Sequence, residues 1–181
     1  MGDLRQNTVS LTLLNSLLML AGCNQPGPEA TFDRSVAIYK VTVGISGNGC
    51  ESACPFQAVS IDNKQKLWYY GGPYAAKKGY FEGNVTKATW DSIQSRFAKV
   101  YTAGVDTLKW ERTDFPEVEL SIESNEGIYK FRKNLGKVSD SDERTLAWFV
   151  DAIPKEIKLS ARDSLKFDTR VQYENVPEAE K

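Results

Sequence analysis

The sequence has no histidine among its 181 residues, and this absence excludes several classes of site. A Ser-His-Asp triad, a Cys-His pair and the histidine-containing zinc sites all require an imidazole ring. The sequence also lacks an excess of charge of one sign, because 23 Lys and Arg residues are balanced by 24 Asp and Glu residues. A protein that binds a polyanion needs a broad basic surface, so we expect no nucleic-acid partner. We likewise predict no metal ion and no cofactor.

The N-terminal apolar run, from Leu11 to Ala21, is too short to cross the roughly 30 Å hydrocarbon core of a membrane. Its length is typical of the apolar part of a secretory signal peptide. The run leads into Leu20-Ala21-Gly22-Cys23, which resembles the lipobox of bacterial lipoproteins, although Arg5 is the one basic residue before it and is offset by Asp3. The resemblance implies that residues 1–22 are a signal peptide and that Cys23 carries a lipid. The alternative is an amphipathic or buried N-terminal helix.

The segment that follows Cys23, up to residue 34, is polar and contains proline and glycine. Such a segment is typical of an extended tether, so we expect the folded part to lie near a membrane without entering it. A lipoprotein of this kind belongs to the bacterial cell envelope, with the membrane as one partner and an envelope protein or a glycan as another. Asn24, in place of the Asp that retains enteric-type lipoproteins at the inner membrane, implies the outer membrane where the host has two.

Residues 35–160 are expected to form one α+β domain, because no linker or change of composition divides them. Before residue 87 the apolar pattern has a period of two, and from there to Gly104 it has the period of a helix. The helix is predicted over residues 87–102, with Thr86 as its N-cap and Gly104 as its stop. Runs of β-branched and aromatic residues predict four earlier strands, over residues 35–45, 56–61, 66–71 and 78–85.

A β-hairpin is the clearest local element of the sequence. Residues 117–123 alternate strictly between polar and apolar side chains, and residues 128–132 alternate in the same way. With Asn125-Glu126 as the loop, Ile122 lies opposite Tyr129, Leu120 opposite Phe131 and Glu119 opposite Arg132. A three-residue loop that includes Gly127 would shift this register by one.

A second amphipathic helix is predicted over residues 140–153. Ser139 and Asp142 resemble a capping box at its start, and Pro154 is expected to end or bend it. Residues 161–181 form a polar C-terminal tail in which residues 165–173 suit a short extra strand. The predicted order is therefore ββββαββα. This order indicates an α+β fold, an antiparallel sheet with both amphipathic helices packed on one face.

Cys50 and Cys54 remain once Cys23 carries the lipid. The cell envelope is oxidising, and a tight turn can bring two cysteines at this spacing within bridging distance, so we predict a disulfide. Because the closed ring is small, the bridge would contribute only about 2 kcal/mol and would serve to fix the loop between the first two strands. A redox-active pair and a metal site are the alternatives. The redox motif has two intervening residues instead of three, and a zinc site here would lack soft ligands.

Five short motifs follow one another in the chain: Cys50-x-x-x-Cys54-Pro55, Tyr70-x-Gly72, Gly79-x-x-x-Gly83, Thr113-Asp114-Phe115-Pro116 and Gly127-x-x-Lys130. Together they resemble the bacterial family called domain of unknown function 6438, over residues 36–153. The chain departs from the family pattern at Glu51-Ser52, where Phe-Gly is usual, and at Gln57, where Tyr is usual. The family has no established activity, so the resemblance implies an architecture and an envelope location but assigns no catalytic residue.

Three side chains are candidate ligand contacts: Asp114, Tyr70 and Tyr74. Asp114 either contacts a ligand or caps a turn before Pro116. The tyrosines belong to a group of aromatic residues that is larger than one buried face of a sheet requires. Its outer members would form a platform that binds a sugar or a protein. The alternative is that these side chains pack beneath the helices. We predict a non-catalytic binding or structural module. A thiol-disulfide redox protein that uses the cysteine pair and a carboxylate-dependent hydrolase are the alternatives.

Overall fold

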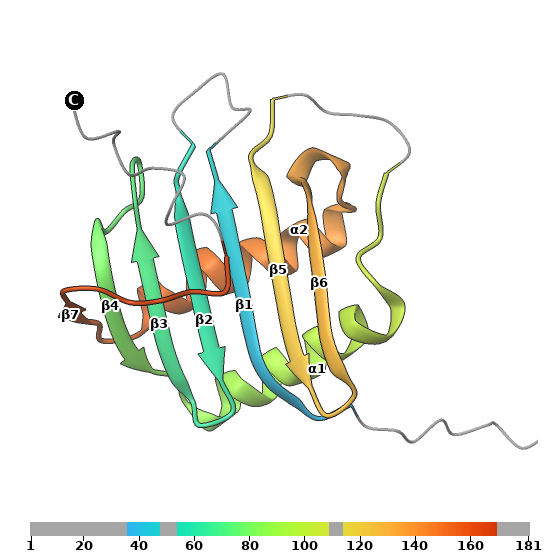
Figure 1. The fold of residues 1–181 in the computed structure, drawn as a ribbon, viewed down its shortest axis with the longest axis horizontal. Helices are drawn as coiled ribbons and strands as arrows, with labels where there is room; N and C mark the ends of the chain where they lie inside the picture. Colours follow the sequence, from blue (N-terminus) through green and yellow to red (C-terminus); the bar gives the residue numbers. More distant parts are fainter. Residues whose placement is uncertain (1–35, 48–53, 109–113, 170–181) are drawn as a thin grey trace, which may run out of the picture. The chain divides into compact units, whose positions relative to one another are not determined.

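The computed structural model describes residues 36–47, 54–108 and 114–169, and all elements named below lie within these ranges. Seven antiparallel strands of the described residues form one sheet in the order β6-β5-β1-β2-β3-β4-β7 (Figure 1). The strands are β1 (Ile38–Ser46), β2 (Gln57–Asp62), β3 (Lys66–Gly71), β4 (Gly79–Asn84), β5 (Glu117–Ser124), β6 (Gly127–Asn134) and β7 (Ser160–Arg162).

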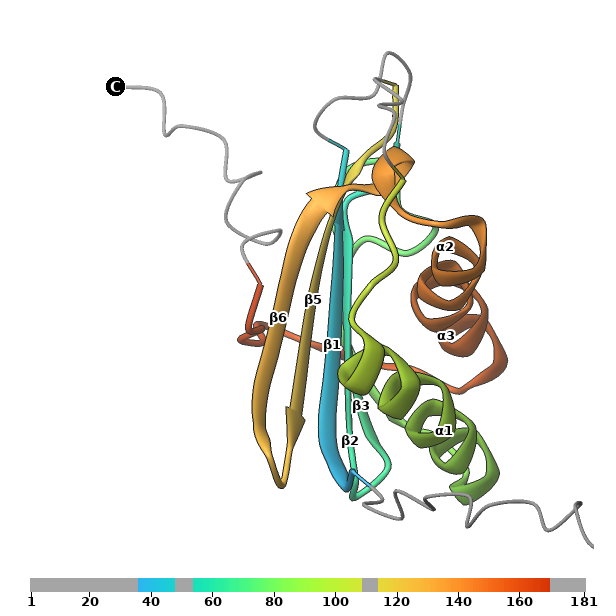
Figure 2. The ribbon, with the colours of Figure 1, turned by 90° about the vertical axis from the view of Figure 1, so that its right-hand side faces the viewer.

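Both amphipathic helices cover the same face of the sheet, as Figure 2 shows. They are α1 (Lys87–Ala103) and a second helical segment that consists of α2 (Asp140–Ala147), a π turn η2 (Trp148–Ala152) and α3 (Ile153–Glu156), after a short 3-10 turn η1 (Leu135–Lys137). The main core lies between these layers, where Val41 and Val43 of the interior strand β1 belong to one buried cluster with Phe97 of α1 and Phe149 of η2. The predicted α+β architecture is therefore confirmed, with one strand added at the end: ββββαββαβ.

The hairpin has the predicted register. Leu120 pairs with Phe131 and Glu119 with Arg132, and Asn125-Glu126 is the loop between the strands. Gly127 has a φ of 131°, a conformation that favours glycine, so it follows the loop without adding a residue to it. The Arg132 guanidinium also binds the Glu117 carboxylate, at 2.6 and 2.8 Å, which adds a bidentate ion pair on the wet face of the hairpin.

The helix starts follow the predicted caps. The Thr86 hydroxyl accepts a 3.1 Å hydrogen bond from the Thr89 backbone N–H, and the Ser139 hydroxyl accepts one of 3.3 Å from Asp142. The second cap differs from a capping box in one respect. The Asp142 carboxylate accepts from the backbone N–H of Asp106, at 2.9 Å, so it ties the segment after α1 to the start of α2.

Pro154 changes the type of the helix instead of ending it at the predicted residue 153. Proline has no N–H, and its ring collides with the carbonyl four residues earlier in an α-helix. The π turn η2 precedes it, and there the Ile153 N–H donates to the Trp148 carbonyl, five residues back. The wider turn accommodates Pro154, and the helix continues to Glu156.

The extra C-terminal strand was predicted over residues 165–173, and that position is wrong for residues 165–169, which are not in a strand. Residues 170–173 lie outside the described ranges. The strand forms earlier, at β7, because the chain leaves α3 beside the free edge of β4 and pairs there with Tyr80, Phe81 and Glu82. Leu165 and Phe167 pack instead against residues of a second cluster. No helix in the described part of the chain is long and apolar enough to span a membrane.

Candidate functional site

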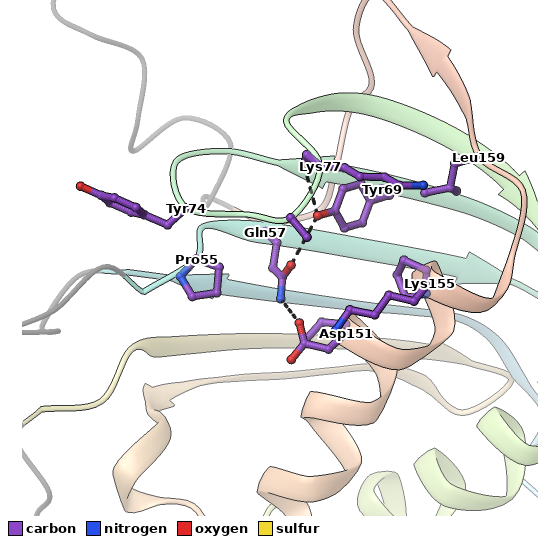
Figure 3. A pocket seen from close by; sticks show the side chains of 11 residues that line it. Pro55, Gln57, Tyr69, Tyr74, Lys77, Asp151, Lys155 and Leu159 are labelled. Atoms are coloured by element: carbon purple, nitrogen blue, oxygen red, sulfur yellow. Dashed lines mark hydrogen bonds between the residues drawn. The ribbon is translucent and has the colours of Figure 1, made fainter.

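A cavity of about 210 Å³ opens between the end of β3, the loop after it and the helical segment formed by η2 and α3 (Figure 3). Most of its lining is apolar, and four polar side chains interrupt it: Gln57, Lys77, Asp151 and Lys155. The other lining residues are Pro55, Tyr69, Tyr74, Ala76, Val150, Pro154 and Leu159. Pockets for drug-sized ligands usually measure roughly 300–1,000 Å³, so this cavity suits a smaller molecule.

Gln57 links the sheet to the helical layer inside this cavity. The residue is 4% exposed, and its Nε2 donates a 2.6 Å hydrogen bond to Asp151 Oδ1 (Figure 3). The Tyr69 hydroxyl lies 3.5 Å from Gln57 Oε1 and 3.4 Å from the Lys77 carbonyl oxygen, and it faces both acceptors. Because the Gln57 amide donates on one side and accepts on the other, its orientation is fixed.

Tyr69 serves as a donor and not as a base. Burial raises the pKa of the Tyr69 hydroxyl above its ordinary value, and the negative charge of Asp151 acts in the same direction. The ordinary value for tyrosine is about 10, so the hydroxyl keeps its proton at neutral pH. Its one proton can be donated to Gln57 Oε1 or to the Lys77 carbonyl oxygen, but it does not supply a phenolate nucleophile.

Three charged groups line the cavity without forming ion pairs to other described side chains. Asp151 Oδ1 accepts from Gln57, whereas no described group donates to Asp151 Oδ2. Lys77 and Lys155 are exposed, and neither ammonium group bonds to a side chain in the described ranges. The cavity can therefore accept hydrogen bonds from a cationic group of a ligand and donate hydrogen bonds to an anionic one.

The backbone around the cavity is held by two short connections between loops. The Phe56 N–H donates to the Pro73 carbonyl at 3.0 Å, and the Gly72 N–H donates to the Phe56 carbonyl at 2.8 Å. These bonds hold the entry to β2 against the exit from β3, so Gln57 and the loop that carries Lys77 meet at one end of the sheet. The π turn supplies the third wall, because Asp151 lies within it.

The structure distributes the three predicted ligand contacts over different places. Tyr74 lines the cavity, with 65% of its surface exposed, and its ring points away from the Gln57–Asp151 pair (Figure 3). Tyr70 is buried in the second cluster, with its ring centroid 5.0 Å from that of Tyr80. Asp114 is exposed just before β5 and is not among the residues that line the cavity.

The cysteine predictions fall mostly on residues outside the described ranges. Cys23 and Cys50 both lie there, so the lipid attachment and the disulfide stay predictions. Cys54 is described and immediately precedes Pro55, a residue of the cavity wall. A bridge to Cys54 would therefore restrain one wall of the cavity.

Sequence reasoning missed the residues that form the centre of the site, Gln57, Tyr69 and Asp151. One signal was available in the sequence: Asp151 is the one charged residue in the apolar run Trp148-Phe149-Val150-Asp151-Ala152-Ile153. A carboxylate in such a run needs a partner when the helix packs on a sheet. The partner itself, Gln57, is 94 residues away in the chain, and no local pattern connects the two.

Comparison with known protein families places most of the folded part of the chain in a family. The model of the family described as Domain of unknown function (DUF6438) matches residues 41–157, from within β1 to just beyond α3. No curated protein matches the chain. The matched range contains the whole Gln57–Asp151–Tyr69 arrangement and excludes β7 and all that follows it. Because the match covers more than half of the sequence, the chain belongs to the DUF6438 family.

Proposed function

We propose that the chain is a lipoprotein of the bacterial cell envelope, acylated at Cys23, with a Cys50–Cys54 disulfide in its folded domain. The lipobox-like Leu20-Ala21-Gly22-Cys23 supports the anchor, and the polar segment that follows it supports a tether. The oxidising compartment and the spacing of the cysteines support the disulfide. Outer-membrane location, where the host has two membranes, rests on Asn24.

The intact mass of the native protein, purified from bacterial membranes, tests this location. We expect a chain that begins at Cys23, carries the mass of its acyl groups and takes up a maleimide only after reduction. The Cys23→Ser variant should keep its signal peptide and carry no acyl mass. A native chain that begins at Met1 with three reactive thiols would contradict the anchor and the disulfide together.

We further propose that the folded domain is a non-catalytic binding module for a small zwitterionic ligand, of the size of an amino acid or a short peptide. One observation carries this proposal: an apolar cavity of about 210 Å³ presents one open carboxylate oxygen, on Asp151, and two ammonium groups, on Lys77 and Lys155, without partners among the described side chains. A ligand ammonium would bind Asp151 Oδ2, and a ligand carboxylate would bind the lysines.

The surroundings of Asp151 make it the more specific of the two contacts. Gln57 fixes one carboxylate oxygen with a 2.6 Å hydrogen bond, and the buried Tyr69 fixes Gln57, so the free oxygen has a defined direction. The lysines are exposed and flexible, and their charges are screened by salt. We expect the cationic group of the ligand to determine specificity and the anionic group to add a smaller, salt-dependent contribution.

A probe series separates these contributions: L-alanine and L-alanyl-L-alanine carry both charges, propionate carries only the anion and ethylamine only the cation. We expect the zwitterions to shift the NMR signals of the Gln57 side-chain amide and to bind at least tenfold more tightly than either single-charge probe. The variant Asp151→Asn should weaken zwitterion binding by about tenfold or more, since a charged hydrogen bond contributes roughly 1.5–3 kcal/mol. Its amide oxygen can still accept from Gln57, so the fold should persist.

The matched control is Lys64→Met, which removes an exposed lysine in the turn between β2 and β3, away from the cavity. It should leave binding unchanged, whereas Lys155→Met should weaken binding at low salt more than at high salt. Equal responses to all four probes, or zwitterion binding that Asp151→Asn does not alter, would contradict the proposed ligand class.

A further inference from the structure

Residues 163–169 cross the face of the sheet that the helices leave open. After β7 the chain passes around the β4 edge and runs in front of β3 and β2 (Figure 1), whereas α1, α2 and α3 lie behind the sheet (Figure 2). We call residues 163–169 the strap. The family match ends at residue 157, so the strap lies outside the family domain, and the face that it covers is formed by strands within that domain.

An aromatic side chain forms the first contact of the strap. Phe167 is 8% exposed and packs with Ala58 of β2 and Tyr70 of β3 in a cluster separate from the main core. The partly buried members of this cluster are Phe56, Trp68, Tyr80 and Leu165. The sheet therefore presents an aromatic patch, built from three strands, that receives one aromatic ring of the strap.

An acidic side chain forms the second contact. Asp168 Oδ2 accepts a 3.1 Å hydrogen bond from the Ser121 hydroxyl of β5, and Asp168 Oδ1 accepts one of 3.2 Å from the Lys130 ammonium of β6. The strap thus offers an aromatic residue and then an acid, and the sheet offers an aromatic patch and then a hydroxyl with a cation. The order of the two strap residues is the order of their contacts on the sheet, and the negative charge of Asp168 meets the positive charge of Lys130.

The strap is attached by these side chains and not by its backbone. No main-chain hydrogen bond joins residues 163–169 to the described strands. The Thr169 hydroxyl oxygen is buried without a hydrogen-bond partner in the described ranges, which lowers the stability of the bound strap. A hollow of about 510 Å³ continues beside Phe167, Asp168 and Thr169 over β5 and β6, so the covered face has room for more chain than the strap fills.

We propose that this open face of the sheet is a docking site for an extended segment of a partner protein that carries an aromatic residue followed by an acidic one. The strap is the resident occupant of the site, and a partner segment of the same pattern replaces it. The site is on the opposite face from the small-ligand cavity, so this proposal stands independently of the proposed function. Because the strap is tethered, its effective concentration is high, and a free peptide competes only when the strap is weakened.

The test uses a fluorescent peptide that copies residues 164–169 and the full chain with the double substitution Phe167→Ala and Asp168→Ala. We expect the peptide to bind this variant at least tenfold more tightly than it binds the unaltered chain, measured by fluorescence anisotropy. Binding should shift the NMR signal of the Trp68 indole. A peptide with alanine in place of its phenylalanine should not bind, and Lys130→Glu added to the double variant should abolish binding.

The matched control is Lys166→Ala, which alters an exposed residue of the strap. This variant should bind the peptide as weakly as the unaltered chain does. The single variant Asp168→Asn retains Phe167 and should give an intermediate affinity. If the double variant does not fold, Asp168→Asn alone decides between the outcomes. A folded variant that binds the peptide no better than the unaltered chain does, or that binds the alanine peptide equally well, would overturn the proposal and make the strap a fixed part of the fold.

Discussion

Replacing Phe97 with alanine is expected to lower the free energy of unfolding by about 3–5 kcal/mol. Phe97 is fully buried on α1, and its ring meets that of Phe149 edge to face, with the centroids 5.1 Å apart. These two rings form one of the contacts between α1 and the π turn that carries Asp151, beside the Arg96 guanidinium over the Trp148 ring, so the cavity left by Phe97→Ala lies between the two helical segments. The relaxation of the π turn should also broaden the Gln57 side-chain amide signals.

The measurement is a urea titration followed by circular dichroism, with Ile128→Ala as the control. Ile128 is 63% exposed on β6, so its truncation removes an apolar side chain without opening a cavity and should cost less than about 1 kcal/mol. If both variants lost similar amounts of stability, the helical layer would not pack on the sheet through Phe97 as described.

The sequence predicts those parts of the fold whose causes are local. The alternation of residues 117–123 and the two-residue loop before Gly127 set the hairpin register, and the pairing of Leu120 with Phe131 follows from them. The hydroxyls of Thr86 and Ser139 mark the helix starts because they satisfy backbone N–H groups within the same turn. Each of these features depends on residues that are close in the chain.

The parts that were not predicted depend on contacts between distant residues. Pro154 alone indicates an end or a bend, whereas the structure has a π turn before it, with Phe149, Val150 and Ile153 buried in the main core. The pairing of Gln57 with Asp151 spans 94 residues, and no local pattern in the sequence connects the two. Tyr69 and Tyr70 are neighbours in β3 and therefore face opposite sides, one in the cavity and the other under the strap.

Replacing Gly71 with alanine is expected to destabilise the domain by about 3 kcal/mol and to abolish zwitterion binding. Gly71 ends β3, and a Cβ at this position would lie 1.7 Å from the Lys77 carbonyl oxygen and 2.9 Å from the Tyr69 hydroxyl oxygen. The first distance is far inside van der Waals contact with backbone, so the loop that carries Lys77 must move. Overpacking of this kind typically costs 1–3 kcal/mol, and the lost Tyr69 hydrogen bond adds to it.

Gly79 provides the control for this prediction, because it pairs with Gly71 in the register of β3 and β4. A Cβ at Gly79 would meet nothing closer than 3.8 Å, but its φ of 110° is unfavourable for alanine. Gly79→Ala should therefore cost about 1–3 kcal/mol of backbone strain without closing the cavity, and the alanine probe should still bind. Denaturant titrations and NMR titrations on both variants separate the two effects. If Gly71→Ala bound L-alanine as tightly as Gly79→Ala does, the position of the Lys77 loop would not matter for the ligand, and the site would have to lie elsewhere than beside Gln57 and Asp151.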